Sequence, residues 1–194
     1  MQLMFDAGCG PAQYQLQGKS FAFPDMSAKL CPQCKADYLR KHGFYERYLV
    51  TIGFAGEIAI RRYHCRECKK TVSLLPSFCH PRRTYGLLAI FGVLAEFYIA
   101  AGTACLAAAR FFATAGVEFS RQLLRHYRRR VEENLNSLIM AITDIYALRA
   151  PPVAERADIR EKVRQLLSRI QSPQDSSFKM FELTSRTYLT NQPN

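Results

Sequence analysis

Two Cys-x-x-Cys pairs, Cys31 to Cys34 and Cys65 to Cys68, constrain the fold of this chain more than any other feature. Each pair can supply two thiolates from one tight turn, and four thiolates complete the tetrahedral shell that a structural Zn²⁺ ion prefers. Pro32 favours the first turn because its ring fixes the backbone angle φ. The pattern therefore predicts a zinc site made by Cys31, Cys34, Cys65 and Cys68.

The spacer between the two pairs predicts a β-hairpin. Residues 45–54 and 57–63 are rich in β-branched and aromatic side chains, and Ala55 and Gly56 separate them. A hairpin would bring the two distant cysteine turns together, so the spacer suits a zinc ribbon better than a helical finger. The fold class expected is α+β: a small N-terminal β zinc ribbon followed by an all-α helical domain with a helix-turn-helix-like unit.

The other cysteines leave alternatives open. Disulfides are one, but seven cysteines cannot all pair within the chain, and residues 1–10 lack the pattern of a secretory signal. A reducing cytoplasm is therefore expected. Cys79 and His80 could form a spare ligand pair, although four thiolates already fill one shell. Cys9 and Cys105 show no ligand spacing and are interpreted as small apolar residues.

The charge of the chain favours a polyanionic partner over a neutral small molecule. There are 27 Lys and Arg against 16 Asp and Glu, which gives a net charge of +11. Residues 29–83 hold 12 of the basic residues and 4 of the acidic ones, a local balance of 12 − 4 = +8. The phosphate contacts predicted in and after the ribbon come from Arg61, Arg62, Lys69, Lys70, Arg82 and Arg83.

A second basic cluster, SRQLLRHYRRR at residues 120–130, predicts a helix with two different faces. Its basic face carries Arg121, Arg125, Arg128 and Arg129, and its apolar face carries Leu123, Leu124, Tyr127 and Val131. Arg121, Gln122 and Arg125 are the candidates for base contacts, because Arg can bond guanine and Gln adenine through paired hydrogen bonds. The alternative is a solvated basic surface with no partner.

The segments before this helix predict a helix-turn-helix-like order. Residues 85–101 predict one apolar helix, Thr103 is a candidate cap for a second, and a turn follows around Gly116. In a helix-turn-helix unit the second helix enters the major groove. The stretch 87–109 is also long enough for a membrane span, but Glu96 at its centre favours a buried helix, so no membrane partner is expected.

The chain is divided by these patterns into a lead segment at 1–28, the zinc ribbon at 29–84 and the helical domain at 85–150. An amphipathic C-terminal helix follows at 151–171 after Pro151 and Pro152, and a flexible tail at 172–194. The apolar side of the C-terminal helix is expected to cover the preceding helices or a second subunit, which would make a homodimer.

Motifs throughout residues 29–85 carry a family resemblance. Besides the two cysteine pairs they include Lys41-His42-Gly43, Tyr45, Arg47, Ile58, Arg61-Arg62-Tyr63, Thr71, Ser73, Leu75-Pro76 and the stretch 81–85. This region resembles the zinc-ribbon domains associated with transposases and other proteins of bacterial insertion sequences. The resemblance implies DNA binding in a mobile-element setting, with a helix-turn-helix segment after the ribbon. It also implies a bacterial cytoplasm, with the protein at the nucleoid when it is bound to DNA.

These observations predict a zinc-dependent protein that binds double-stranded DNA and is not an enzyme. A transposase catalytic domain needs three metal-binding carboxylates on a βαβ scaffold, and the chain has neither the alternating strands nor the room for one. A site with four cysteines leaves no open metal position, and no small-molecule substrate is expected. The alternative is a protein-binding adaptor that recruits a transposase or another partner through the ribbon and the helices.

Overall fold

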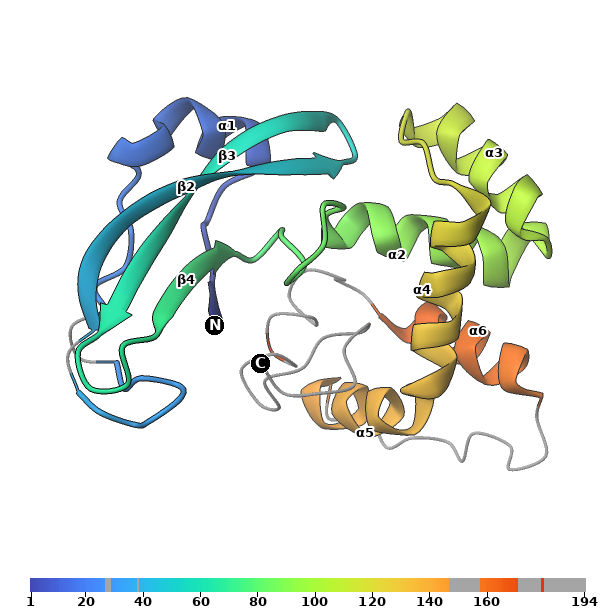
Figure 1. Cartoon of the computed structure of the whole chain (residues 1–194). Helices are drawn as coiled ribbons and strands as arrows, with labels where there is room; N and C mark the ends of the chain where they lie inside the picture. Colours follow the sequence, from blue (N-terminus) through green and yellow to red (C-terminus); the bar gives the residue numbers. More distant parts are fainter. Residues whose placement is uncertain (27–28, 38, 147–157, 171–178, 180–194) are drawn as a thin grey trace.

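The chain folds into a four-stranded sheet beside a group of helices (Figure 1). The structure, a computed structural model, describes residues 1–26, 29–37, 39–146, 158–170 and 179. The sheet and α1 occupy one half of the molecule, and α2 leads from the sheet into the helical half. The mixed α+β class predicted from the sequence is confirmed.

The sheet is built around a long hairpin. Strands β2 (Leu39–Thr51) and β3 (Phe54–Cys65) pair antiparallel, and β4 (Thr71–Pro76) pairs antiparallel with β3. The strand β1 (Gln2–Phe5) adds to β4 in parallel, which gives the order β1-β4-β3-β2. The first residues, predicted only as a lead segment, therefore supply a strand of the sheet.

The hairpin turns three residues earlier than the sequence predicted. Thr51 pairs with Phe54, so Ile52 and Gly53 form the turn, while Ala55 and Gly56 lie inside β3. Gly53 has a φ of 71°, in the left-handed region that glycine adopts at low cost. The prediction of a turn at Ala55-Gly56 was wrong because two glycines three residues apart both offered a turn signal.

The helix α1 (Pro11–Gln17) and the short 3₁₀-helix η1 (Gly18–Ser20) lie against one face of the sheet. Tyr14 anchors them: its side chain is fully buried, and its hydroxyl donates to the Ala59 carbonyl of β3 at 2.9 Å. Phe21 and Phe23 follow η1 and pack their rings around Tyr14. The segment 11–23 thus forms a layer that covers one face of the sheet.

The helical half begins with α2 (Leu87–Ala95), which continues as a π-helix, η2 (Glu96–Ala101). Next come α3 (Ala104–Ala115) and α4 (Arg121–Glu133). Both start at caps, because the Thr103 hydroxyl accepts from the Leu106 N–H and the Ser120 hydroxyl from the Leu123 N–H. Thr103 is confirmed as the cap predicted from the sequence. Within the described ranges, no helix has the length and apolar character needed to cross a membrane.

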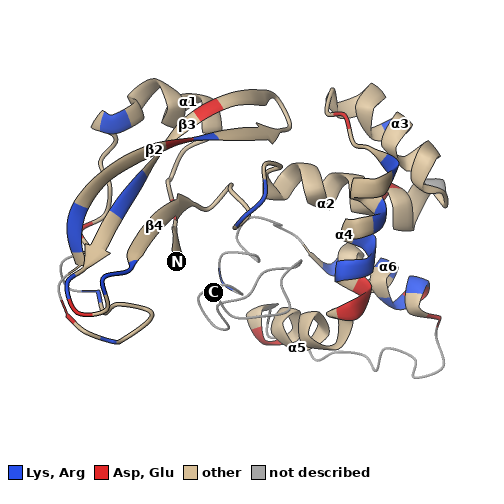
Figure 2. Ribbon diagram, in the orientation of Figure 1, with Lys and Arg blue, Asp and Glu red and all other residues tan. Residues whose placement is uncertain are grey.

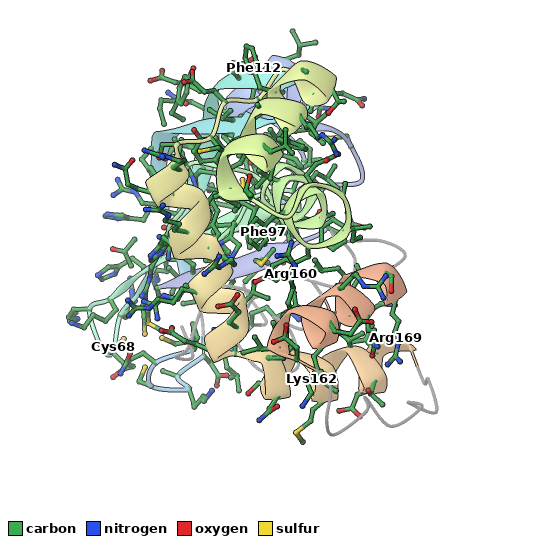
Figure 3. The ribbon with its side chains drawn as sticks, turned by 90° about the vertical axis from the view of Figure 1, so that its right-hand side faces the viewer. Cys68, Phe97, Phe112, Arg160, Lys162 and Arg169 are labelled. Carbon is green, nitrogen blue, oxygen red and sulfur yellow. The ribbon has the colours of Figure 1, made fainter. Side chains whose placement is uncertain are left out.

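Two more helices complete the described fold. α5 (Leu135–Tyr146) starts after Asn134, and α6 (Ile159–Arg169) packs beside η2. Arg160 of α6 donates to the Phe97 carbonyl at 2.9 Å, and Figure 3 shows the two side by side. The predicted stop at 150–152, the first part of the predicted C-terminal helix at 151–157 and the predicted tail, apart from Lys179, lie outside the described residues.

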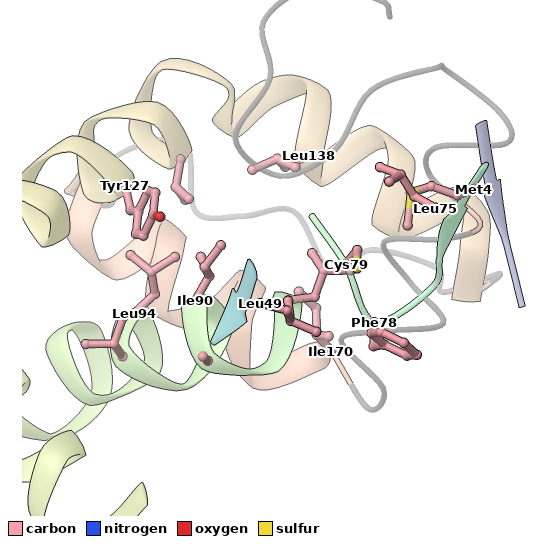
Figure 4. Packing of buried hydrophobic residues seen from close by; sticks show 14 of the residues in the cluster. Met4, Leu49, Leu75, Phe78, Cys79, Ile90, Leu94, Tyr127, Leu138 and Ile170 are labelled. Carbon is pink, nitrogen blue, oxygen red and sulfur yellow. The ribbon is translucent and has the colours of Figure 1, made fainter. Parts of the chain in front are cut away.

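One hydrophobic core joins the two halves. Buried side chains from the sheet and from the helices form a single cluster, in which Leu49 of β2 lies near Cys79 and Ile90 (Figure 4). Backbone bonds reinforce this junction: the Val50 N–H donates to the Thr84 carbonyl at 3.0 Å, and the Gly86 N–H donates to the Val50 carbonyl at 2.8 Å. The sheet and the helices therefore share their interior.

Candidate metal centre and nucleic-acid interface

Two matching turns present the four cysteines. In the first turn the Cys31 N–H donates to the Ala36 carbonyl at 2.8 Å, and in the second the Cys65 N–H donates to the Lys70 carbonyl at 3.0 Å. The residue after each second cysteine is a lysine with positive φ, 61° at Lys35 and 56° at Lys69. The same local backbone therefore occurs twice, as expected for two halves of one metal site.

The hairpin brings these turns together. Cys65 is the last residue of β3 and pairs with Leu39, the first residue of β2. The turn that ends just before β2 therefore lies beside the turn that begins at the end of β3. The sulfur atoms of Cys31 and Cys68 are 3.7 Å apart, and those of Cys34 and Cys65 are 3.5 Å apart. All four sulfurs lie within 4.8 Å of one another.

These distances fit a tetrahedral metal site. Sulfurs held at the usual zinc–sulfur distance of about 2.3 Å in a tetrahedron lie about 3.8 Å from one another. Cys31 and Cys65 are fully buried, while Cys34 and Cys68 face the outside, so solvent reaches only one side of the site. Cys31, Cys34, Cys65 and Cys68 could bind a metal ion, and their thiolates leave no ligand position for a substrate.

The environment of the cluster shifts the pKa values of two of its thiols in opposite directions. Burial acts to raise the pKa of Cys31, but the backbone N–H groups of Cys34 and Gln33 lower it to about 7. The backbone N–H of Lys70 acts to lower the pKa of Cys68, but desolvation and the neighbouring sulfurs raise it to about 12. A bound cation would deprotonate the remaining thiols, since metals bind the thiolate form.

Cys79 and His80 do not extend this cluster. Both side chains are fully buried in the loop after β4, and neither belongs to the group of four sulfurs. Burial raises the pKa of the Cys79 thiol to about 12, which keeps it protonated. Cys105, expected to be a small apolar residue, is instead exposed, and its sulfur accepts from Arg121 at 3.7 Å.

His80 gives the protein a predictable response to acid. Burial, helped by the charges of Arg83 and Arg47, lowers its pKa from 6.5 to about 4, although its contact with the Pro81 carbonyl acts in the opposite direction. The unfolded chain therefore binds a proton before the folded chain does. The contribution of neutral His80 to the free energy of unfolding is complete above pH 6.5 and is lost as pH falls towards 4. The loss is about 3 kcal/mol at most.

We expect the imidazole of His80 to stay neutral in an NMR titration down to about pH 4.5, where an ordinary histidine is charged. At a constant metal-ion concentration, the free energy of unfolding of H80N should vary less steeply with pH between 6.5 and 4.5 than that of the unsubstituted protein. Equal slopes for the two proteins would contradict this role.

The structure separates the basic residues predicted to bind phosphate. Arg61 and Arg62 are neighbours in β3 and therefore point to opposite faces of the sheet. The Arg61 guanidinium lies 4.5 Å from the Phe44 ring centroid, and that of Arg62 lies 5.9 Å from the Tyr45 centroid. One flat surface cannot contact both side chains. Figure 2 shows further Lys and Arg at the cysteine end of the hairpin, in the loop after β4 and along α4.

The loop after β4 links the sheet to α4. Arg47 of β2 donates to the His80 carbonyl at 2.5 Å and also to the Arg83 carbonyl, which fixes the course of the loop. Arg82 is exposed, with a φ of 60°, and the Arg83 guanidinium lies 5.9 Å from the ring centroid of Tyr127 on α4. Lys69 and Lys70, also predicted to bind phosphate, are exposed beside the second cysteine turn.

The helix α4 has the two faces predicted from the sequence. Leu124, Tyr127 and Val131 are buried, whereas Arg121, Gln122 and Arg125 are exposed. The other two candidates, both in the second half of the helix, form ion pairs within it. Arg128 pairs with Glu132 at 3.2 Å, and Arg129 pairs with Glu133 at 2.7 Å. The first half of α4 therefore presents its polar side chains with fewer acidic neighbours.

The loop between α3 and α4 is held by aromatic contacts. Gly116 ends α3 in the left-handed conformation, and Phe119 is buried a few residues later. The Phe119 ring stacks on Tyr85 with centroids 4.3 Å apart, and the Tyr85 hydroxyl donates to the Glu118 carbonyl at 2.9 Å. These contacts fix the start of α4 relative to the loop after β4.

His126 is a residue of this region that the sequence did not single out. It lies on α4, and burial together with the charges of Arg83, Arg130 and Arg129 lowers its pKa. Arg83, from the loop after β4, therefore lies in the same basic environment as the second half of α4.

Residues 31–108 match a protein-family model described as a domain of unknown function (DUF6431). The match begins at the first cysteine of the candidate metal site and extends through β2, β3, β4 and α2 into α3. No curated protein and no solved structure matches the chain.

Proposed function

We propose that this chain is a zinc-dependent DNA-binding protein that recognises double-stranded DNA through the first half of α4. The observation that carries the proposal is the exposed group Arg121, Gln122 and Arg125, which lies opposite the buried face of the same helix. Arg and Gln at the start of a helix are suited to bidentate contacts with base edges in the major groove. The net charge of +11 supplies general attraction to phosphates.

Zinc is the metal proposed for the four cysteines. A closed shell of thiolates is typical of structural zinc, and iron is the other metal that such a shell commonly holds. The role of the metal would be to fix the two cysteine turns at the open end of the hairpin. This would hold β2 in place, and with it Arg47, which contacts the loop after β4. The metal would thus position the binding surface without contacting DNA or a substrate. A non-enzymatic role agrees with this closed shell.

The setting in a mobile genetic element is part of the proposal and rests on the resemblance of residues 29–85 to transposase-associated zinc ribbons. The order of α3, the loop held by Phe119 and Tyr85, and α4 supports a helix-turn-helix-like use of α4. The five-residue loop 116–120 sets α4 apart from tighter forms of that unit.

Replacing Arg125 with glutamine tests the proposal. We expect R125Q to weaken binding to a preferred duplex by about 5-fold to 150-fold, since a good base contact contributes about 1–3 kcal/mol. Fluorescence anisotropy at several salt concentrations, with duplexes from a selection experiment, would measure the change. The matched control is R164Q, which removes the same charge from α6, where Arg164 is paired with Glu161 at 2.6 Å. Equal effects of the two substitutions would contradict recognition by α4.

A second candidate function is a protein-binding adaptor, and the outer face of α3 favours it. Phe112 and Leu106 are 56% and 43% exposed, and Ile99 of η2 is 53% exposed. Figure 3 shows Phe112 at the outer edge of the helical half. Salt separates the two functions, because phosphate binding weakens steeply as salt rises and an apolar interface responds little.

A further inference from the structure

A basin with basic and aromatic walls lies on the face of the sheet that also carries α1. Its volume is about 380 Å³, and its walls are the segment 19–25 and the neighbouring parts of β2 and β3. This size falls within the range of about 300–1,000 Å³ that is usual for small-molecule sites. The basin is distinct from the metal centre and from α4, which belongs to the other half of the molecule (Figure 1).

Three cations from three different elements line the basin. Lys19 comes from η1, Lys41 from β2 and Arg61 from β3. Asp25 is the one acidic residue of the lining, so the formal charge is 3 − 1 = +2. Positive charge that converges from separate elements is suited to an anion such as a phosphate group.

The position of Arg61 is fixed before any ligand binds. Its guanidinium lies 4.5 Å from the Phe44 centroid and 5.8 Å from the Tyr63 centroid. Lys41 is paired directly with Tyr63 across the hairpin, so it lies on the same face of the sheet. Arg61 would therefore lose little conformational freedom when it binds an anion.

Aromatic rings form the rest of the lining. Phe21 and Phe23 are half-buried, with their centroids 5.2 Å apart and their planes at 70°. Phe23 also lies 5.6 Å from Phe44, which links these rings to the Arg61 contact. Half-buried rings beside cations are the combination on which single-stranded nucleic acids bind, because bases stack on rings while phosphates contact Lys and Arg.

We propose that this basin binds one unpaired nucleotide of a single-stranded DNA segment. A base would stack against Phe21 or Phe23, and the adjoining phosphate would contact Lys19, Lys41 and Arg61. Bases of an intact duplex are stacked inside it and cannot enter such a basin. The inference rests on the proposed function in that DNA is the partner. It goes beyond that function by assigning single-stranded DNA to the basin, while duplex DNA is assigned to α4.

The test compares two DNA probes on the full-length protein. Fluorescence anisotropy would measure the binding of a labelled ten-nucleotide oligo(dT) and of a labelled blunt duplex to the unsubstituted protein, R61Q, F23L and R125Q. R61Q and F23L should weaken single-strand binding by about 5-fold or more, as expected for losing a stacked base or its phosphate partner, and should leave duplex binding within 2-fold. R125Q should weaken duplex binding and leave single-strand binding within 2-fold. R164Q should change the binding of neither probe.

The binding of the single-stranded probe decides the basin proposal. Single-strand binding that is absent in the unsubstituted protein, or equally tight in R61Q and F23L, overturns the basin proposal even if the duplex proposal stands. Single-strand binding that depends on Arg61, with no duplex binding at all, supports the basin and refutes recognition by α4. If R61Q or F23L melts at a lower temperature, the double variant K19Q/K41Q replaces it, since both lysines are exposed.

Discussion

We expect replacement of Cys31 with serine to abolish the proposed zinc binding and to remove most of the stability of the sheet. Cys31 is fully buried, and its sulfur lies 3.7 Å from that of Cys68. Structural zinc binding in small domains contributes about 10–16 kcal/mol. The net stability of a whole domain is about 5–15 kcal/mol, so a chain without the metal should unfold at least around the hairpin ends. Elemental analysis and thermal unfolding by circular dichroism would measure both effects.

The control for this experiment is C105S, since Cys105 is exposed and does not belong to the four-sulfur cluster. It should retain one zinc per chain and the melting temperature of the unsubstituted protein. A strong chelator should reproduce the C31S result in the unsubstituted protein. An unsubstituted protein that is purified without stoichiometric metal and yet melts cooperatively would contradict the proposed role of zinc.

Replacing Tyr14 with alanine will cost about 3–5 kcal/mol, as large truncations of buried aromatic side chains do. The ring is fully buried and lies 4.7 Å from Phe21 and 5.5 Å from Phe78, measured between centroids. Its removal would leave a cavity between α1 and the sheet. It would also leave the Ala59 carbonyl without its hydroxyl donor. Urea unfolding would measure the loss as a lower midpoint.

The matched variant Y14F separates packing from hydrogen bonding. It keeps the ring and removes only the donor to Ala59, so its cost should be about 1 kcal/mol. If Y14A and Y14F lost the same stability, the packing of α1 on the sheet would not be the stabilising contact. Because Tyr14 also supports Phe21 and Phe23, Y14A should weaken oligo(dT) binding more than Y14F does.

The sequence predicted the features that depend on local chemistry. Two residues between cysteines determine a turn that presents two sulfurs, whatever the rest of the chain does, and the four-sulfur cluster follows once a hairpin joins the turns. Thr103 likewise marks a helix start, because its hydroxyl group accepts from the N–H group three residues later. Such signals need no distant partner.

The features that were missed depend on distant partners. The strand β1 has four residues, and its ladder pairs Gln2 with Ser73, so nothing in the first residues alone shows that they form a strand. Arg61 and Arg62 lie on opposite faces of the sheet for another reason: residues along a strand alternate between its faces, which the sequence could have revealed. The basin was missed because its cations are separated by 20 or more residues in the chain.

The join between β2 and the segment 84–86 has a consequence for how this protein could have arisen. Val50 bonds to residues on both sides of the point where the sequence suggested a boundary between ribbon and helices. A cut there would break backbone bonds and open the shared interior at Leu49 and Ile90. Recombination that exchanged either half alone would replace one side of this shared interior, so the halves are expected to be inherited as one unit.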